Sequence, residues 1–222
     1  MRVSIPFTCP RCTATVRRPG LWSDHWSCTE HGPVTPLHPP APASPELLTR
    51  LGAASRVPLW VPWPLPVGWL LTGVRYAGDD HTGPVATVLS VSGPHPLGLV
   101  PRSGDDVEVV QPCADLLVVA EQPGVGLGAR FAGLSDVDPG ETAATGAAHL
   151  KLSAAGHDVP LWNVPAVEMA AYVGEAAGVW LWVLVWPVAT GAVVLEDFAL
   201  RDLCDPTNHL DMPVGALSPR LG

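Results

Sequence analysis

Four residues near the N-terminus constrain this chain more than any other feature. Two residues separate Cys9 from Cys12, two separate Cys28 from His31, and fifteen lie between the pairs. With this spacing, two short turns, here called knuckles, supply the four ligands of a tetrahedral zinc site. The sequence therefore predicts a small zinc ribbon over residues 1–33, with Cys9, Cys12, Cys28 and His31 as ligands and Zn²⁺ as cofactor.

The fourth ligand has a competitor, because His25 lies three residues before Cys28 and His31 lies three residues after it. We favour His31, because it repeats the order of the first knuckle and Gly32 permits the turn beyond it. Thr13 occupies the position past the first knuckle where many ribbons have glycine. Four protein ligands favour a structural zinc, and a water in the fourth position would instead make a catalytic one. Stray thiols in a loop are the remaining alternative.

Charge is distributed unevenly along the 222 residues. The whole chain carries a formal charge of -9, whereas residues 1–33 carry +2, so the remainder carries -11. Duplex binding depends largely on neutralised phosphates, so an acidic body disfavours nucleic acid. Contact with nucleic acid through Arg11, Arg17 and Arg18 of the ribbon is a second alternative function.

The sequence predicts three consecutive parts. After the ribbon, residues 34–56 form a proline-rich linker, extended and stiff enough to space the ribbon from the third part, and then a short helix. Ser44 and Pro45 are typical of a helix start, and Gly52 of its end. Residues 57–222 form a β-rich domain.

Period-two alternation in the third part indicates strands. The predicted class is α+β: a small N-terminal zinc ribbon followed by a mainly antiparallel, Trp-rich β-sheet domain with few short helices. A hairpin is expected from 69–76 and 85–91, and residues 99–112 are expected to be an exposed excursion. Further strands are expected over 116–121, 149–153 and 159–164.

Residues 176–195 carry no charge over twenty positions, which is long enough to consider a membrane span. Pro187 and Gly191 interrupt this stretch, and no Lys or Arg marks an inside end. Because its tryptophans keep period two, we expect a buried hairpin, with one strand to Trp186 and another from Ala192, and no membrane span.

Three tryptophans, Trp60, Trp63 and Trp69, lie in an uncharged, proline-rich strap over residues 57–74. One interpretation is an aromatic groove for a ligand or partner peptide, because rigid aromatics give large contact area at low entropic cost. We favour the other, in which the strap crosses the domain and fills its core with tryptophans.

A glycine-rich loop over residues 124–130 contains Gly124, Gly126, Gly128 and Arg130. It comes after a predicted strand, as a dinucleotide-binding loop does, but the required helix and second strand are missing after it. A glycine-permitted bend is the favoured interpretation. The loop and Arg130 remain the binding candidates for an alternative function, a small-molecule enzyme of acyl or phosphoryl transfer.

No nucleophile elbow or P-loop lysine is present, so the favoured function is non-catalytic. We expect a zinc-ribbon protein that binds or scaffolds an unknown protein partner. The N-terminus has no apolar run typical of a secretory signal, and three of five cysteines have metal spacing. These features predict a cytoplasmic location.

Several strings of the chain are familiar as a set: Cys9-Pro-Arg-Cys12, Cys28-Thr-Glu-His31-Gly32, Val61-Pro-Trp-Pro-Leu-Pro-Val-Gly-Trp69, Gly124-Val-Gly-Leu-Gly-Ala-Arg130 and Gly215-Ala-Leu-Ser-Pro-Arg-Leu221. Together they resemble an uncharacterised family of actinobacterial proteins of similar length with a zinc ribbon. Some members have been labelled phosphotransacetylase. That label implies an acetyl-CoA and phosphate site, and it is retained here only as the enzyme alternative.

Overall fold

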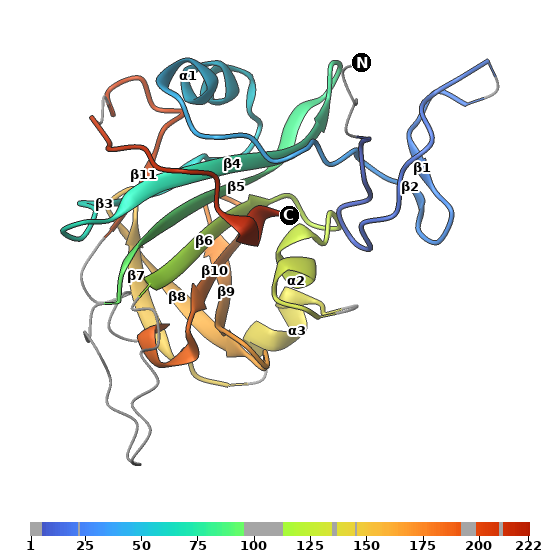
Figure 1. Ribbon diagram of the computed structural model, residues 1–222. Helices are drawn as coiled ribbons and strands as arrows, with labels where there is room; N and C mark the ends of the chain where they lie inside the picture. The colour runs from blue at the N-terminus through green and yellow to red at the C-terminus, as the bar shows by residue number, and fades with distance from the viewer. Residues whose placement is uncertain are drawn as a thin grey trace, which may run out of the picture.

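The computed structural model describes residues 6–21, 23–95, 113–134, 137–144, 146–191, 199–208 and 211–222 (Figure 1). These residues form a two-stranded sheet, a nine-stranded sheet and a few short helices. The elements are β1 (Ser27–Cys28), β2 (Gly32–Pro33), α1 (Pro45–Ala54), β3 (Trp60–Trp63), β4 (Leu70–Asp79), β5 (Gly83–Pro94), β6 (Cys113–Glu121), α2 (Leu127–Phe131), α3 (Pro139–Ala144), β7 (Leu150–Ala154), β8 (His157–Val164), β9 (Ala170–Ala176), β10 (Val179–Trp186), the 3₁₀ turn η1 (Val188–Thr190), β11 (Ala199–Asp202) and the 3₁₀ turn η2 (Pro219–Leu221).

The large sheet has the strand order β3-β11-β7-β8-β9-β10-β6-β5-β4 and curls on itself (Figure 1). The curl brings the chain before β3 across the inner side of β5, where the Thr87 hydroxyl donates to the Pro58 carbonyl at 2.8 Å. The inner side therefore encloses one large core, which α1 closes with Leu48 and Leu51.

Alternate side chains of β10 point to opposite sides of the sheet, and both sides are buried. Leu181 and Val183 point into the inner core, whereas Trp182 and Leu184 point to the outer side. There α2 covers them with Leu127 and neighbouring residues. A strand buried on both sides reads as a continuous apolar run, which is why this stretch resembled a membrane segment in the sequence.

The predicted α+β class with a mainly antiparallel sheet is wrong. The described chain is mostly β, with few and short helices, and its large sheet is mixed. The parallel contact arises because β11 comes after β10 in the chain but inserts between β7 and β3, with Leu200 opposite Ala154. Sequence patterns reveal which residues form strands, and this non-local insertion leaves no mark in them.

The hairpin expected from residues 69–76 and 85–91 is confirmed as β4 and β5. The predicted partner of β10 is wrong, because β10 pairs with β9 and β6. The strand expected from Ala192 and the excursion at 99–112 lie outside the described residues. Among the residues that are described, no helix is long and apolar enough to cross a membrane.

The proline-rich linker is extended, as expected, but it does not act as a free spacer. It lies antiparallel to β4, with Leu37 opposite Ala77 and Ala41 opposite Val74. The amides of His38 and Ala41 each donate to β4 carbonyls at 2.9 Å. The linker therefore holds the N-terminal segment against the sheet.

The predicted helix start is confirmed in α1, where the Ser44 hydroxyl accepts from the amide of Leu47. The expected stop at Gly52 is wrong, because α1 continues to Ala54. A Cβ at Gly52 would lie 2.9 Å from the Leu203 carbonyl oxygen. Glycine is needed there for close packing of α1 against the chain after β11.

Candidate metal centre and the adjoining cleft

The first knuckle is a tight turn closed by backbone hydrogen bonds. The amide of Cys9 donates to the Ala14 carbonyl at 2.8 Å, and the amide of Thr13 donates to the Cys9 carbonyl at 3.1 Å. Thr13 has φ of 65°, the left-handed conformation that glycine adopts more easily. The second knuckle uses a glycine at the matching place, Gly32, with φ of 66°.

The two knuckles bring the predicted donors together: the ligand atoms of Cys9, Cys12, Cys28 and His31 all lie within 4.8 Å of one another. The Sγ atoms of Cys12 and Cys28 are 3.6 Å apart, and His31 Nδ1 lies 3.7 Å from Cys9 Sγ and 3.8 Å from Cys28 Sγ. A Zn–S bond of about 2.3 Å puts the sulfurs of a tetrahedral site about 3.8 Å apart. The donor set therefore fits a four-coordinate metal ion.

His31, and not His25, belongs to the cluster. The ring of His25 lies outside it and pairs with the exposed carboxylate of Asp24, Nδ1 to Oδ1, at 3.1 Å. Of the two histidines that the sequence left in competition, the structure therefore brings His31 to the three cysteines.

The surroundings of Cys12 and Cys28 shift the pKa values of their thiols in opposite directions. Burial raises the pKa of Cys12 to about 12, and the neighbouring thiols act in the same direction. Burial also raises the pKa of Cys28, but the amides of Glu30 and His31 and the His31 ring outweigh it and bring that pKa to about 6. The second knuckle thus already favours a thiolate, the form that binds metal.

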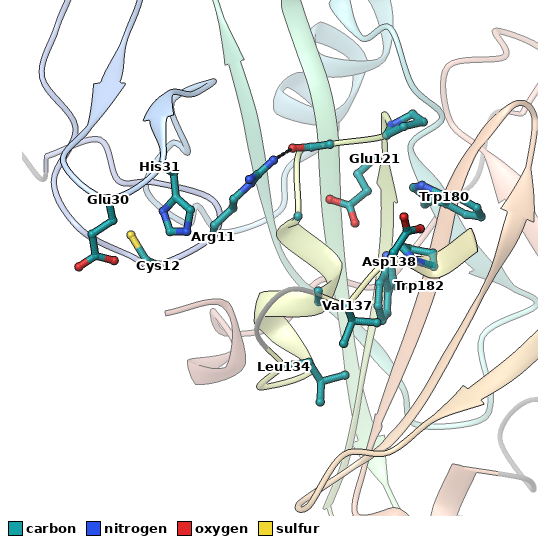
Figure 2. Close-up of a pocket in the computed structure, with 15 residues that line it drawn as sticks. Arg11, Cys12, Glu30, His31, Glu121, Leu134, Val137, Asp138, Trp180 and Trp182 are labelled. Atoms are coloured by element: carbon teal, nitrogen blue, oxygen red, sulfur yellow. Dashed lines mark hydrogen bonds between the residues drawn. The ribbon is translucent and has the colours of Figure 1, made fainter. Parts of the chain in front are cut away.

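Arg11, between Cys9 and Cys12, connects the first knuckle to the body. Its guanidinium donates to the carbonyl oxygen of Gly124 (Figure 2) and, at 3.3 Å, to that of Val125. Its side chain also lies against Gly126, where a Cβ would be 3.0 Å from Arg11 Cγ. The first knuckle therefore lies directly on the glycine-rich loop.

The amides at the end of this loop already have a hydrogen-bond partner within the chain. The buried Glu121 carboxylate, at the end of β6, accepts from the amide of Leu127 at 2.6 Å and that of Gly128 at 3.2 Å. Burial raises the pKa of Glu121, while these amides and the Trp182 indole act in the opposite direction. A carboxylate of the chain itself occupies the amides that a phosphate would use in a nucleotide-binding loop.

Backbone conformation and close packing explain why glycines occupy this loop. Gly124 and Gly126 have φ of 88° and 78°, which side chains rarely adopt. Gly128 lies so close to the Trp182 indole that a Cβ would collide with it. Arg130, in α2, donates to the Gly222 oxygen at 3.4 Å, and burial lowers its pKa.

The three tryptophans of the strap lie away from the loop. Trp60 and Trp69 are each 2% exposed within the inner core, and Trp63 is half-buried in β3. The indole of Trp69 packs tightly against Gly93 of β5.

A cleft of about 770 Å³ lies between the Cys/His cluster and the β-rich part of the chain after the linker, here called the body. Cys12, Glu30 and His31 line it on the ribbon side. Across from them, Figure 2 shows Glu121 at the end of β6, with Asp138 beside Trp180 and Trp182 of β10.

Sequence reasoning missed Glu121, Arg75 and the docking role of Arg11. Arg75 is buried and donates to the His38 and Leu221 carbonyls at 2.7 Å each and to the Thr8 hydroxyl at 3.2 Å. Burial lowers its pKa to about 10, with a contribution from Arg130. A charged residue next to an apolar run was the available signal for both, because Arg75 lies within β4 and Glu121 directly follows the apolar run 116–120 of β6.

No curated protein and no solved structure matches this chain. One family model does match, and it supports neither an actinobacterial distribution, nor a zinc-ribbon family, nor the phosphotransacetylase label. That model is described as Family of unknown function (DUF6758) and covers residues 1–221, so the chain belongs to this family of unknown function.

Proposed function

We propose that Cys9, Cys12, Cys28 and His31 bind one structural Zn²⁺, and that the protein is a non-catalytic cytoplasmic module that binds another protein. The complete four-donor cluster carries the metal proposal. Three thiolates and one imidazole form a common structural zinc set, with no position left for a reacting water. A reducing cytoplasm keeps such thiols available as ligands, and all five cysteines are free.

Metal analysis of the purified protein tests the first part. We expect about one zinc per chain, and His31→Ala lowers the affinity for zinc. His25→Ala is the matched control, because His25 lies in the same ribbon outside the cluster. Equal loss of affinity in the two variants, or a folded wild-type ribbon without metal, would contradict a Cys₃His zinc site.

The partner-binding part is supported by the hairpin between the knuckles. Arg17 pairs with Ser27 and Gly20 with Ser23, so the described residues 17–21 and 23–27 project from the candidate metal centre, away from the large sheet (Figure 1). Leu21 near its tip is 97% exposed, and Arg17 and Arg18 of the same hairpin are also exposed. A hairpin that presents an exposed apolar residue and exposed arginines suits an apolar pocket with an acidic rim on a partner protein.

Cross-linking of the zinc-loaded protein in cell extract tests this surface. We expect cross-links from residues 17–27 to one partner, and weaker binding of that purified partner by Leu21→Ser and Arg17→Glu. Val167→Ser is the control, because Val167 is 96% exposed but lies between β8 and β9. Cross-links confined to the body, or equal weakening by Val167→Ser, would overturn the proposal. Trp22, a further candidate of the same hairpin, lies outside the described residues.

The two alternatives gain no support from the site. Phosphoryl or acyl transfer at the loop would need amides that Glu121 already occupies. Nucleic-acid contact would use Arg11, whose guanidinium is held by the loop carbonyls, leaving Arg17 and Arg18. A shift assay at low salt checks the second alternative, and we expect no shift.

A further inference from the structure

The cleft beside the metal centre has the size of a small-molecule site. Its volume of about 770 Å³ lies within the range of roughly 300–1,000 Å³ that is usual for ligand pockets. The docked ribbon forms one wall and the outer side of the large sheet forms the other. Neither wall alone would make a concave site.

The charged groups around this cleft favour a cationic occupant. Glu30 and Asp138 line it with exposed carboxylates, and Arg11 is its one lining arginine among the described residues. The Glu121 carboxyl also borders the cleft, but it is buried and bonded to the loop amides. The Arg11 guanidinium points to the carbonyls of Gly124 and Val125, so its donors are already engaged. Three thiolates around a divalent ion add a further negative charge on the ribbon side.

An aromatic wall stands next to one of these carboxylates. Trp180 of β10 is half-buried, so part of its ring is open to the cleft. Asp138 is fixed at the start of α3, because its Oδ1 accepts from the Gly140 amide at 2.8 Å. A Cβ built on Gly140 would lie 3.1 Å from this oxygen and 3.9 Å from the Trp180 ring, so the two groups are close neighbours.

We propose that this cleft binds a small organic cation, a quaternary or protonated amine carried on an apolar body, with the cation between Trp180 and Asp138. An indole face is the best aromatic partner for an ammonium group, and a carboxylate at its side adds charge complementarity. Glu30 supplies a second carboxylate from the ribbon. Because the ribbon forms a wall, this inference rests on the proposed structural metal.

Calorimetric titration of zinc-loaded protein with phenyltrimethylammonium tests the site. We expect binding in the micromolar to millimolar range and little or none for benzenesulfonate, an anion with the same ring. Trp180→Leu should weaken binding roughly tenfold and Asp138→Asn roughly threefold. Asp138→Asn keeps an acceptor for the Gly140 amide, so it preserves the start of α3. Asp205→Asn, outside the cleft, is the control and should bind as wild type.

Three outcomes would overturn the cation site: no heat with zinc-loaded wild-type protein at millimolar probe, equal affinity for benzenesulfonate, or equal weakening by Asp205→Asn. Zinc content measured on the same sample separates this inference from the metal proposal. Zinc-loaded protein that does not bind the probe contradicts the cation site alone. Folded protein that contains no zinc contradicts the metal centre and removes the basis of the inference.

Discussion

The ribbon and the body depend on different interactions for their stability. Among its described residues, the ribbon has a buried cluster of three, Cys9, Val16 and Cys28, with a few half-buried neighbours. The body buries apolar side chains on both sides of a nine-stranded sheet. Burying one aliphatic side chain contributes about 1.5–3 kcal/mol, whereas structural zinc contributes about 10–16 kcal/mol. With the proposed zinc bound, ligand chemistry folds the ribbon, whereas exclusion of water folds the body.

Loss of a metal ligand should give the largest effect and should separate the two regions. In Cys28→Ser, we expect residues 6–33 to lose amide protection, because zinc binding of about 10 kcal/mol or more supplies the ribbon's stability. Strands β5, β6 and β10 should keep their protection. Hydrogen exchange followed by mass spectrometry measures both. Cys113→Ser, an exposed cysteine outside the cluster, is the control. A protected ribbon in Cys28→Ser would break the comparison.

A cavity in the core of the body should destabilise the body and leave the ribbon folded. Leu181 is fully buried in β10, so Leu181→Ala should lower the free energy of unfolding of the body by about 2–5 kcal/mol. Zinc content should stay at the wild-type value. Denaturant titration with metal analysis measures the two quantities, and Leu21→Ala, at an exposed position, should cost almost nothing. Zinc loss in Leu181→Ala under native conditions would show that the regions fold as one unit.

Removing the link between the regions should have a smaller effect. Arg11→Met removes the hydrogen bonds to Gly124 and Val125 and should weaken docking of the ribbon by about 1 kcal/mol. Zinc should still bind but should leave several-fold faster when a chelator is added, because the first knuckle opens more often. Arg17→Met, at an exposed ribbon position, is the control. Equal release rates in both variants would mean that Arg11 does not hold the ribbon.

The smallest effect should be a change in pH dependence. Burial raises the pKa of Glu121 in the folded protein, so folding favours the protonated carboxyl. The stability from this group is present below its unfolded pKa, near 4.5, and is lost as pH rises through the folded value. Glu121→Gln should therefore gain stability relative to wild type as pH rises. Unfolding of both proteins across this range measures the difference, with Glu141→Gln on α3 as control. A constant difference would contradict a raised pKa.

The sequence could predict that Cys9, Cys12, Cys28 and His31 come together, because the geometry of each knuckle is local. Two residues between ligands fix each knuckle, and Gly32 marks the turn after the second. Strands β4 and β5 could also be predicted from the sequence, because their period-two alternation and the tight turn between them lie within one stretch of chain. In these places the neighbours that determine the structure are also neighbours in sequence.

The remaining features depend on residues that are distant in sequence. The parallel contact of β11 with β7 brings Leu200 to Ala154, and Arg11 reaches Gly124 across more than a hundred residues. The role of Gly128 is visible only once Trp182 lies against it. Composition and spacing carry no record of such pairings, so the mixed sheet and the cleft could be recognised only in three dimensions.

The proline-rich linker has a consequence for how the molecule behaves among its own copies. Strand β4 is an edge strand of the large sheet, and an unpaired edge strand is a template for aggregation. The linker covers this edge at Leu37 and Ala41, and the chain near Val214 covers it at Leu71. Because proline has no N–H, the linker pairs with β4 but offers few donors to a further strand. The segment therefore terminates the sheet and keeps its edge from recruiting another chain.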